Sequence, residues 1–322
     1  NEVFKTNCRD EGGEISCRFG RAFGKSMNRL VLTIAFIGIV TSTPAELIEI
    51  SGGTIEVEWA SSPSPAGRAL ALDWVRTSAR AVSEYYGHFP VRRVKLRIAE
   101  RAGTRPGGGQ AFGWRGPLIT ISLGRDATAA TIANDWLLTH EMVHLGFPSL
   151  PERHHWLEEG LATYIEPIAR VRIGILTPER AWADLVEGLP QGQPQAGDRG
   201  LDYTPTWGRT YWGGALFCLR ADVAIRQRTA NQHGLEDALR AVLAAGGSID
   251  REWPIDRVIE VGDDAVGVPI LRELYNEMSA DPVVVDLKSL WQQLGIQQKG
   301  GRVSFDDTAP LAKIRDAIMP KK

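Results

Sequence analysis

His140-Glu141-Met142-Val143-His144 and, further along, Trp156-Leu157-Glu158-Glu159-Gly160 are the two most informative segments of this chain. Histidines four positions apart lie on one face of an α-helix, about 6 Å from each other, so both imidazoles can bind one metal ion. Glu141 lies about 100° further round the same helix, where a general base beside the open position of a metal belongs. A third protein ligand is needed, and Glu159 on the next helical segment is a candidate. The spacing therefore predicts a zinc site built on both histidines, with Glu159 as a candidate third ligand and water as the fourth ligand.

Apolar residues flank the two histidines, which indicates a largely buried helix rather than a surface helix with ordinary polar residues. A buried imidazole beside a carboxylate needs polar partners, and a metal ion supplies them. Glu158 competes with Glu159 for the place of third ligand, and His154 and His155 are further alternatives. The flanking apolar residues are Ile132, Trp136, Leu137, Leu138, Val143 and Leu145.

The composition is that of a globular protein, with 43% hydrophobic and 24% charged residues among 322 and a formal net charge of −2. That length is enough for two domains or one elaborated domain. A near-neutral charge balance without a Lys/Arg tract gives no electrostatic reason to expect a nucleic-acid partner. The chain has ten tryptophans, and several lie near the two motifs, where they can line a cleft or simply belong to the core.

The N-terminal region resembles a secretory signal. Arg29 follows Met27, the apolar run Leu30–Val40 comes next, and Thr43-Pro44-Ala45 ends the segment. A positive start, a short apolar run and a small-x-small site are typical of a signal peptide, and the run is too short to span a bilayer comfortably. We therefore predict a signal peptide over residues 27–45, export to the periplasm or the extracellular space, and no membrane span afterwards. Residues 1–26 are interpreted as non-native upstream sequence.

The rest of the chain divides into three predicted parts. Residues 46–126 show alternating strand patterns around one amphipathic helix and form a small α/β subdomain. Residues 127–280 are almost entirely helical, and residues 281–322 form a small appendage with a hairpin and a final helix. Strands are expected over Leu47–Trp59 with a turn at Gly52-Gly53, over Val91–Ala99 and over Leu118–Leu123, and the helix over Gly67–Tyr86.

Three helices matter most for the predicted site. The first is expected to run without a break from about Ala127 to Leu145. The second starts near Glu152, and Pro167 is expected to kink or end it because proline cannot continue the helical hydrogen bonds. The third is expected to be one long apolar helix over Thr206–Arg228.

The residues that follow His144 distinguish between classes of zinc site. The metzincin pattern requires glycine and histidine where this chain has Phe147 and Leu150, whereas a glutamate on a second helix matches the gluzincin arrangement. Three segments resemble the motifs of aminopeptidase-N-like gluzincins, and more closely those of the glycyl-aminopeptidase branch, whose members often carry a PDZ domain that is not evident here. The segments are His140–His144, Trp156–Ala162 and Tyr211-Trp212-Gly213-Gly214-Ala215.

The resemblance implies an α+β fold, in which a small mixed β-sheet layer precedes a mainly helical, thermolysin-like zinc peptidase domain. It implies an exported zinc-dependent metallopeptidase that hydrolyses peptide bonds through a zinc-bound water activated by Glu141. Glu159 resembles the third zinc ligand, and Tyr211 resembles the tyrosine whose hydroxyl stabilises the oxyanion. The small residues Gly213–Ala215 would let their helix approach the zinc helix closely.

One segment departs from the family pattern. Aminopeptidase-N relatives have a Gly-x-Met-Glu-Asn segment whose glutamate holds the free α-amine of the substrate, but the corresponding stretch Gly108–Trp114 contains no acid. Aminopeptidase and endopeptidase activity therefore both stay open, and the stretch can serve as an edge that pairs with an extended peptide. The alternative function is an inactive peptide-binding or scaffolding protein. Retention of Glu141 favours the enzyme, because a binding protein has no use for a general base.

Overall fold

The computed structural model describes residues 45–321 of the chain. The predicted upstream segment, and all of the predicted signal peptide except its last residue, lie outside the described residues. Within residues 45–321 no helix is both long and apolar enough to cross a membrane.

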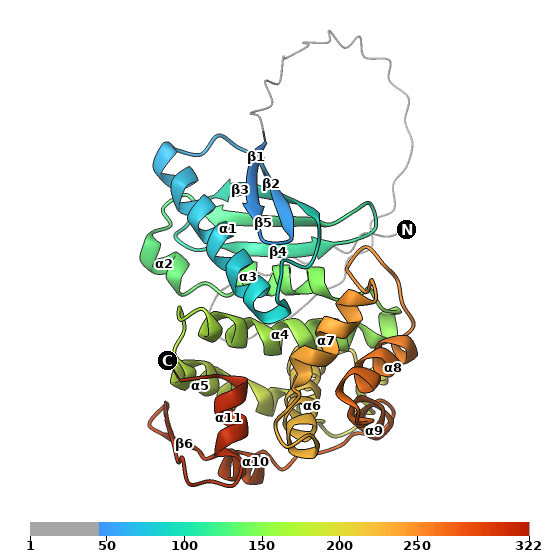
Figure 1. The fold of residues 1–322 in the computed structure, drawn as a ribbon. Coiled ribbons are helices and arrows are strands. Elements are labelled where there is room, and N and C mark those ends of the chain that lie inside the picture. Colours follow the sequence, from blue (N-terminus) through green and yellow to red (C-terminus); the bar gives the residue numbers. More distant parts are fainter. Residues whose placement is uncertain (1–44, 322) are drawn as a thin grey trace, which may run out of the picture. The chain divides into compact units, whose positions relative to one another are not determined.

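A five-stranded mixed sheet forms the first part of the described chain (Figure 1). Its strand order is β1-β2-β3-β5-β4, in which β2, β3 and β5 are parallel and the outer strands β1 and β4 run antiparallel to their neighbours. Strand β4 therefore lies at one edge of the sheet. The strands are β1 Glu46–Ile50, β2 Gly53–Trp59, β3 Arg93–Arg101, β4 Gly107–Phe112 and β5 Leu118–Gly124.

Helices make up most of the chain after the sheet. Helix α1 lies between β2 and β3 in sequence, and the other helices come after β5, interrupted only by the hairpin β6–β7 (Figure 1). These elements are α1 Pro65–Tyr86, α2 Ala129–Ala133, α3 Leu137–Val143, α4 His155–Arg172, α5 Pro178–Gly188, α6 Gly214–Arg228, α7 Leu235–Ala244, α8 Ile255–Val266, α9 Ile270–Met278, α10 Leu287–Leu294, β6 Ile296–Lys299, β7 Arg302–Phe305 and α11 Ala312–Ile318. The predicted fold class, a small mixed sheet followed by a mainly helical region, is confirmed.

Helix α1 packs against both the sheet and the helices that carry the predicted site. Its start is set by Ser64, whose hydroxyl accepts a hydrogen bond from the Gly67 amide at 3.1 Å, and by Pro65 in the first turn. It ends at Gly87, which adopts φ +86°, a left-handed conformation that favours glycine. Its buried face includes Trp74 and Val82. The helices α3 and α4 lie between the sheet and the later helices (Figure 1).

The helix predicted over Ala127–Leu145 is wrong as a single element. The chain forms the short helix α2, breaks at residues 134–136, and restarts as α3. The Asp135 carboxylate accepts hydrogen bonds from the Trp74 indole at 2.9 Å and from the Leu138 amide at 3.4 Å. Because the first amides of a helix have no partner within the helix, a carboxylate at this point stabilises a new helix start.

The expectation that Pro167 would end its helix is also wrong. A 3₁₀ turn at Glu152–His154 precedes α4, and α4 continues past Pro167 to Arg172. An interior proline costs about 3 kcal/mol because it removes a helical hydrogen bond and crowds the preceding turn. Pro167 and most of its neighbours on α4 are buried. Burial of apolar surface on several sides offsets the local cost, which sequence spacing alone cannot weigh.

The third helix prediction, Thr206–Arg228, needs a smaller correction. The segment begins with a π-helical turn over Gly208–Gly213, and only then continues as α6. A π-helical turn contains an extra residue for each hydrogen-bonded ring, so it shifts the side chains that come after it around the helix axis. Tyr211 lies inside this turn.

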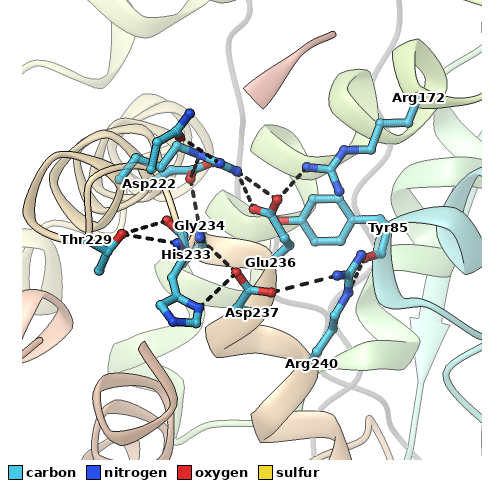
Figure 2. A network of polar contacts seen from close by, with 12 residues as sticks. Tyr85, Arg172, Asp222, Thr229, His233, Gly234, Glu236, Asp237 and Arg240 are labelled. Atoms are coloured by element: carbon cyan, nitrogen blue, oxygen red, sulfur yellow. Dashed lines mark hydrogen bonds and ion pairs between the residues drawn. The ribbon is translucent and has the colours of Figure 1, made fainter. Parts of the chain in front are cut away.

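A network of buried and partly buried polar contacts joins α1, α4, α6 and α7 (Figure 2). Asp222 of α6 accepts hydrogen bonds from Arg226 at 2.8 Å and from the Leu235 amide at 3.0 Å. Glu236 of α7 contacts Arg226 at 2.7 Å and Arg172 of α4 at 2.9 Å. Arg240 of α7 donates to the carbonyl oxygen of Tyr85 in α1 at 2.5 Å. These contacts connect the helix that covers the sheet to the helices that lie beyond α4.

Candidate metal centre

Two helices bring three metal-ligating side chains together. His140 lies on α3, His144 directly follows α3, and Glu159 lies on α4. Glu159 Oε2 is 3.2 Å from His140 Nε2 and 3.6 Å from His144 Nε2. The ligand atoms of all three residues lie within 4.8 Å of one another. The side chains predicted from spacing as a ligand set therefore converge on one point.

The donor set fits zinc. Two imidazole nitrogens and one carboxylate oxygen are ligands that zinc binds in catalytic sites, where the fourth position stays open. Ligand atoms about 2 Å from a tetrahedral ion lie roughly 3.3 Å from one another, and the two measured separations between Glu159 and the imidazoles are close to this value. All three side chains are largely buried, so the polar atoms have little access to water as a substitute partner.

The alternative third ligands occupy other positions. Glu158 points to the amide of Leu150, which donates to its carboxylate at 3.0 Å. His154 is buried, and both of its ring nitrogens have partners, Asp202 at Nδ1 and Arg153 at Nε2. His155 is partly exposed.

His155 nevertheless lies beside the cluster. Its Nε2 is 3.4 Å from Glu159 Oε1, the carboxylate oxygen that does not face His140. A polar group on the second oxygen of a carboxylate ligand orients the first one. His155 is therefore placed to hold the Glu159 carboxylate in position rather than to join the three ligand atoms.

Glu141 follows His140 on α3 and lies against the edge strand β4 of the sheet. A Cβ atom at Gly109 would lie 2.7 Å from Glu141 Oε1, so this close approach of strand and carboxylate requires glycine. Burial raises the pKa of the Glu141 carboxyl to about 7, because the charged form loses hydration. A carboxylate with a pKa near neutrality can both accept and return a proton.

The pKa values of the three ligand side chains depend on one another. Burial lowers the pKa of His140. Burial also acts to lower the pKa of His144, but the hydrogen bond and the negative charge of Glu159 outweigh it and raise this pKa to about 9. Burial acts to raise the pKa of Glu159, whereas its contacts with both histidines hold it well below its usual range. The negative charge of Glu159 thus holds a proton on His144.

Tyr211 lies next to the cluster, in the π-helical turn before α6. Its ring stacks on the His140 ring with 6.2 Å between centroids and 19° between planes. Burial and the nearby charge of Glu159 raise the pKa of the hydroxyl above its ordinary value, so Tyr211 keeps its proton and remains a hydrogen-bond donor.

Two glycines set the distance between the helix of Glu159 and the helix of Tyr211. A Cβ atom at Gly160 would collide with the backbone of Gly214, and one at Gly214 would collide with the Trp156 carbonyl oxygen. The backbones of α4 and α6 therefore touch at this point. The expected close approach of the small residues occurs, but against α4 rather than against the helix that carries the histidines.

Sequence reasoning missed two carboxylates that hold these helices. Asp135 binds the start of α3 through the Leu138 amide. Asp202, in a 3₁₀ turn over Leu201–Tyr203, accepts hydrogen bonds from His154 at 3.0 Å and from the Trp156 indole at 2.8 Å, both at the start of α4. A lone aspartate in a loop gives no signal of such a contact. The one available signal is that a buried tryptophan indole needs a hydrogen-bond acceptor close to its N–H group.

Comparison with solved structures finds proteins that superpose on much of this chain. An aminopeptidase N family protein from Idiomarina loihiensis superposes with a TM-score of 0.59 at 15% sequence identity, over 79% of this chain and 50% of that chain. An M1 zinc metallopeptidase from Deinococcus radiodurans gives a TM-score of 0.48 at 15% identity, over 76% of this chain and 53% of that chain. The chain thus spans about half the length of the solved structures that it matches. No family model and no curated protein sequence matches it. The resemblance inferred from the three motifs is confirmed at the level of the fold, which the chain shares with an aminopeptidase N family protein.

Proposed function

We propose that this protein is a zinc-dependent metallopeptidase that hydrolyses peptide bonds. The observation that carries the proposal is the convergence of His140, His144 and Glu159, with Glu141 beside them and Tyr211 stacked on His140. An isolated metal site needs only the three ligands. A carboxylate of raised pKa and a phenol donor at the same site are what acyl transfer to water requires in addition.

The ligands of the single zinc ion would be His140, His144 and Glu159. When bound, zinc acts as a Lewis acid that polarises a carbonyl oxygen and lowers the pKa of water. Glu141 accepts the proton of the attacking water and returns it to the leaving amine, a task that its pKa of about 7 suits. The Tyr211 hydroxyl donates a hydrogen bond to the oxyanion that develops on the scissile carbonyl.

The substrate would be a peptide or protein bound in extended form. Strand β4 is at the edge of the sheet, and among the described residues it pairs with β5 on one side only. An extended peptide can add to such an edge through main-chain hydrogen bonds. Because Gly109 of β4 touches Glu141, a peptide along this strand would pass the proposed general base. The absence of an acid over Gly108–Trp114 favours no particular cleavage direction, so the proposal covers both aminopeptidase and endopeptidase activity.

Export is part of the proposal and is supported by sequence alone. The pattern of residues 27–45 is the observation behind it, and the mature protein would begin near Glu46. N-terminal sequencing of the protein isolated from its native host checks this point. A chain that retains Met27, or a protein found in the cytosol, contradicts export without affecting the proposed chemistry.

The substitution Glu141→Gln tests the enzyme proposal. We expect this variant to keep about one zinc per chain and to lose peptide hydrolysis by at least about a hundredfold, because an amide cannot accept the proton of water. The measurements are metal content by elemental analysis and digestion of a peptide library followed by mass spectrometry. Glu158→Gln is the matched control, since Glu158 undergoes the same chemical change but turns toward the Leu150 amide. Wild-type protein that binds peptides and zinc but cleaves nothing would instead be an inactive peptide-binding protein.

A further inference from the structure

Two exposed tryptophans flank the candidate metal centre. Trp136 is 50% exposed and Trp207 is 61% exposed, although tryptophan side chains are usually buried for the most part. Trp136 lies four residues before His140, and Trp207 lies four residues before Tyr211. The Trp136 ring contacts the His140 ring and the Trp207 ring contacts the Tyr211 ring, so each indole is next to a side chain of the site.

The rings of these four residues form a continuous series. The Trp136 ring meets the His140 ring edge to face, with 5.4 Å between centroids. The His140 ring stacks on that of Tyr211 at 6.2 Å, and the Tyr211 ring stacks on that of Trp207 at 5.9 Å. The imidazole and the phenol lie in the middle of the series, and the two exposed indoles lie at its ends.

Trp136 immediately precedes α3, and Trp207 immediately precedes the π-helical turn. Exposed indole surface costs free energy in proportion to the apolar area that faces water, so ligand groups that cover these rings gain that energy. Large apolar side chains beside a few convergent polar groups are the usual composition of a small-ligand site.

We propose that Trp136 and Trp207 form subsites for large apolar side chains, preferably aromatic ones, of the residues on the two sides of the scissile bond. This inference rests on the proposed peptidase function and names the class of peptide that the site takes. Aromatic side chains pack on indole rings in stacked or edge-to-face geometry, which adds to the energy of area burial. Peptides with alanine at these positions cover little of either indole.

The experiment compares two peptides that differ only in carrying phenylalanine or alanine at both positions beside the cleaved bond. For the wild-type protein we expect kcat/KM to be at least about tenfold higher for the phenylalanine peptide, the size of effect that an apolar pocket commonly produces. Trp136→Ala and Trp207→Ala should each raise KM for the phenylalanine peptide more than for the alanine peptide, so that the ratio of the two kcat/KM values falls. Leu47→Ala is the control, because Leu47 is 59% exposed but lies on β1, at the opposite edge of the sheet.

A binding measurement keeps the inference independent of turnover. In the Glu141→Gln background, calorimetric titration should show tighter binding of the phenylalanine peptide, and each tryptophan substitution should reduce the difference. If an alanine variant melts well below the wild type, Trp136→Phe and Trp207→Phe replace it, with smaller changes expected in the same direction.

The possible results separate the two proposals. Cleavage without preference for phenylalanine, unchanged in both tryptophan variants, overturns the aromatic subsite and leaves the peptidase proposal standing. Absence of any cleavage overturns the peptidase proposal, whereas the titrations still decide whether the indoles bind apolar side chains. Loss of preference in the Leu47→Ala control as well would show that the effect does not arise at the site, and this outcome also overturns the subsite.

Discussion

In the absence of metal, the Glu159 carboxylate stabilises the protonated form of His144. Glu159 lies 3.6 Å from the His144 ring, and its negative charge raises the pKa of His144 to about 9 from an ordinary value of 6.5. Below about pH 9, His144 is therefore expected to carry a positive charge when no metal is bound. Zinc binds only the neutral imidazole, so a zinc ion at the proposed site would have to displace that proton.

The resulting prediction concerns the pH dependence of zinc binding. Because the pKa of His144 is raised, the apparent zinc affinity should increase by about tenfold for each pH unit between about 7 and 9, and should level off above that range. Competition with a chelator of known affinity, in buffers from pH 6.5 to 9.5, measures this change. A flat affinity across the range would mean that His144 is already neutral without metal.

A second prediction uses a Tyr211 variant to distinguish an effect on substrate binding from an effect on catalysis. Tyr211→Phe removes only a hydroxyl, so the variant should fold, keep its zinc and retain the stacking on His140. If the hydroxyl meets the oxyanion only in the transition state, kcat should fall by about 10²–10³-fold while KM changes little. Steady-state kinetics with one peptide decides between the two roles. Full activity of the phenylalanine variant would assign Tyr211 to packing alone.

The site residues differ in how far sequence reveals them. His140, Glu141 and His144 are close in sequence, and helical periodicity alone puts them side by side. Glu159 could be chosen over Glu158 only through the family resemblance, because adjacent residues on α4 point in directions about 100° apart and the rotation of α4 depends on packing. Asp135 and Asp202 act through partners far away in the chain, and no local pattern encodes those contacts.

The sequence predicted that these segments are helical, but it did not predict where each helix breaks or continues. Apolar periodicity indicated a helix before and through His140, yet the break at residues 134–136 depends on hydrogen bonds from Asp135 to Trp74 of α1. Likewise, α4 passes through Pro167 because the surrounding helices bury it. In both places long-range packing outweighs local preference, which is why the boundaries were wrong where the element type was right.

A third prediction concerns the contact between α4 and α6. Gly214→Ala adds a Cβ atom that collides with the Trp156 carbonyl oxygen, so the helices must separate. We expect a loss of about 1–3 kcal/mol in the free energy of unfolding, together with lower activity, because Glu159 and Tyr211 move apart. Chemical denaturation and peptide hydrolysis measure the two effects.

Gly262→Ala on α8 is the matched control for this substitution. There the nearest atom to a new Cβ is a methyl group of the Leu271 side chain, which can rotate away, and alanine favours a helix over glycine. Its stability should change little and its activity should stay at the wild-type level. Equal losses in both variants would contradict a specific role for the Gly160–Gly214 contact.

At the scale of the whole molecule, the polar network that joins α1, α4, α6 and α7 is expected to contribute to the free energy of unfolding (Figure 2). Asp222 is buried and pairs with Arg226, which is buried as well. Asp222→Ala leaves the Arg226 charge with one carboxylate fewer and the Tyr164 hydroxyl without its acceptor. Breaking a buried pair in this way costs about 3–5 kcal/mol, so the variant should have a clearly lower Tm.

Glu273→Ala is the control for the network. Its partner Arg228 is paired at 2.6 Å, but both side chains are nearly half exposed. Exposed ion pairs contribute about 0–1 kcal/mol, so this variant should melt close to the wild type. A Tm loss that is equally large in both variants would show that burial is not what makes the network important.

The order of sheet and helices was predictable for the molecule as a whole, because strand-like alternation gives way to helical periodicity near residue 127. The strand order was not. The pairing of β3 with β5, and the position of β4 outside β5, depend on contacts between segments that no local pattern relates. That arrangement brings β4 against α3, and thus supplies the backbone that lies next to Glu141.

Helix α3 is only seven residues long. Isolated helices shorter than about 12–15 residues do not persist in water, so α3 depends on its neighbours and on whatever ties it to α4. A metal held by His140, His144 and Glu159 is such a tie. Stripped of zinc, α3 should be among the first segments to exchange its amide hydrogens and to become accessible to nicking by other proteases. In an environment poor in zinc, the protein would then be degraded faster as well as being inactive. Its abundance would therefore depend on the supply of metal.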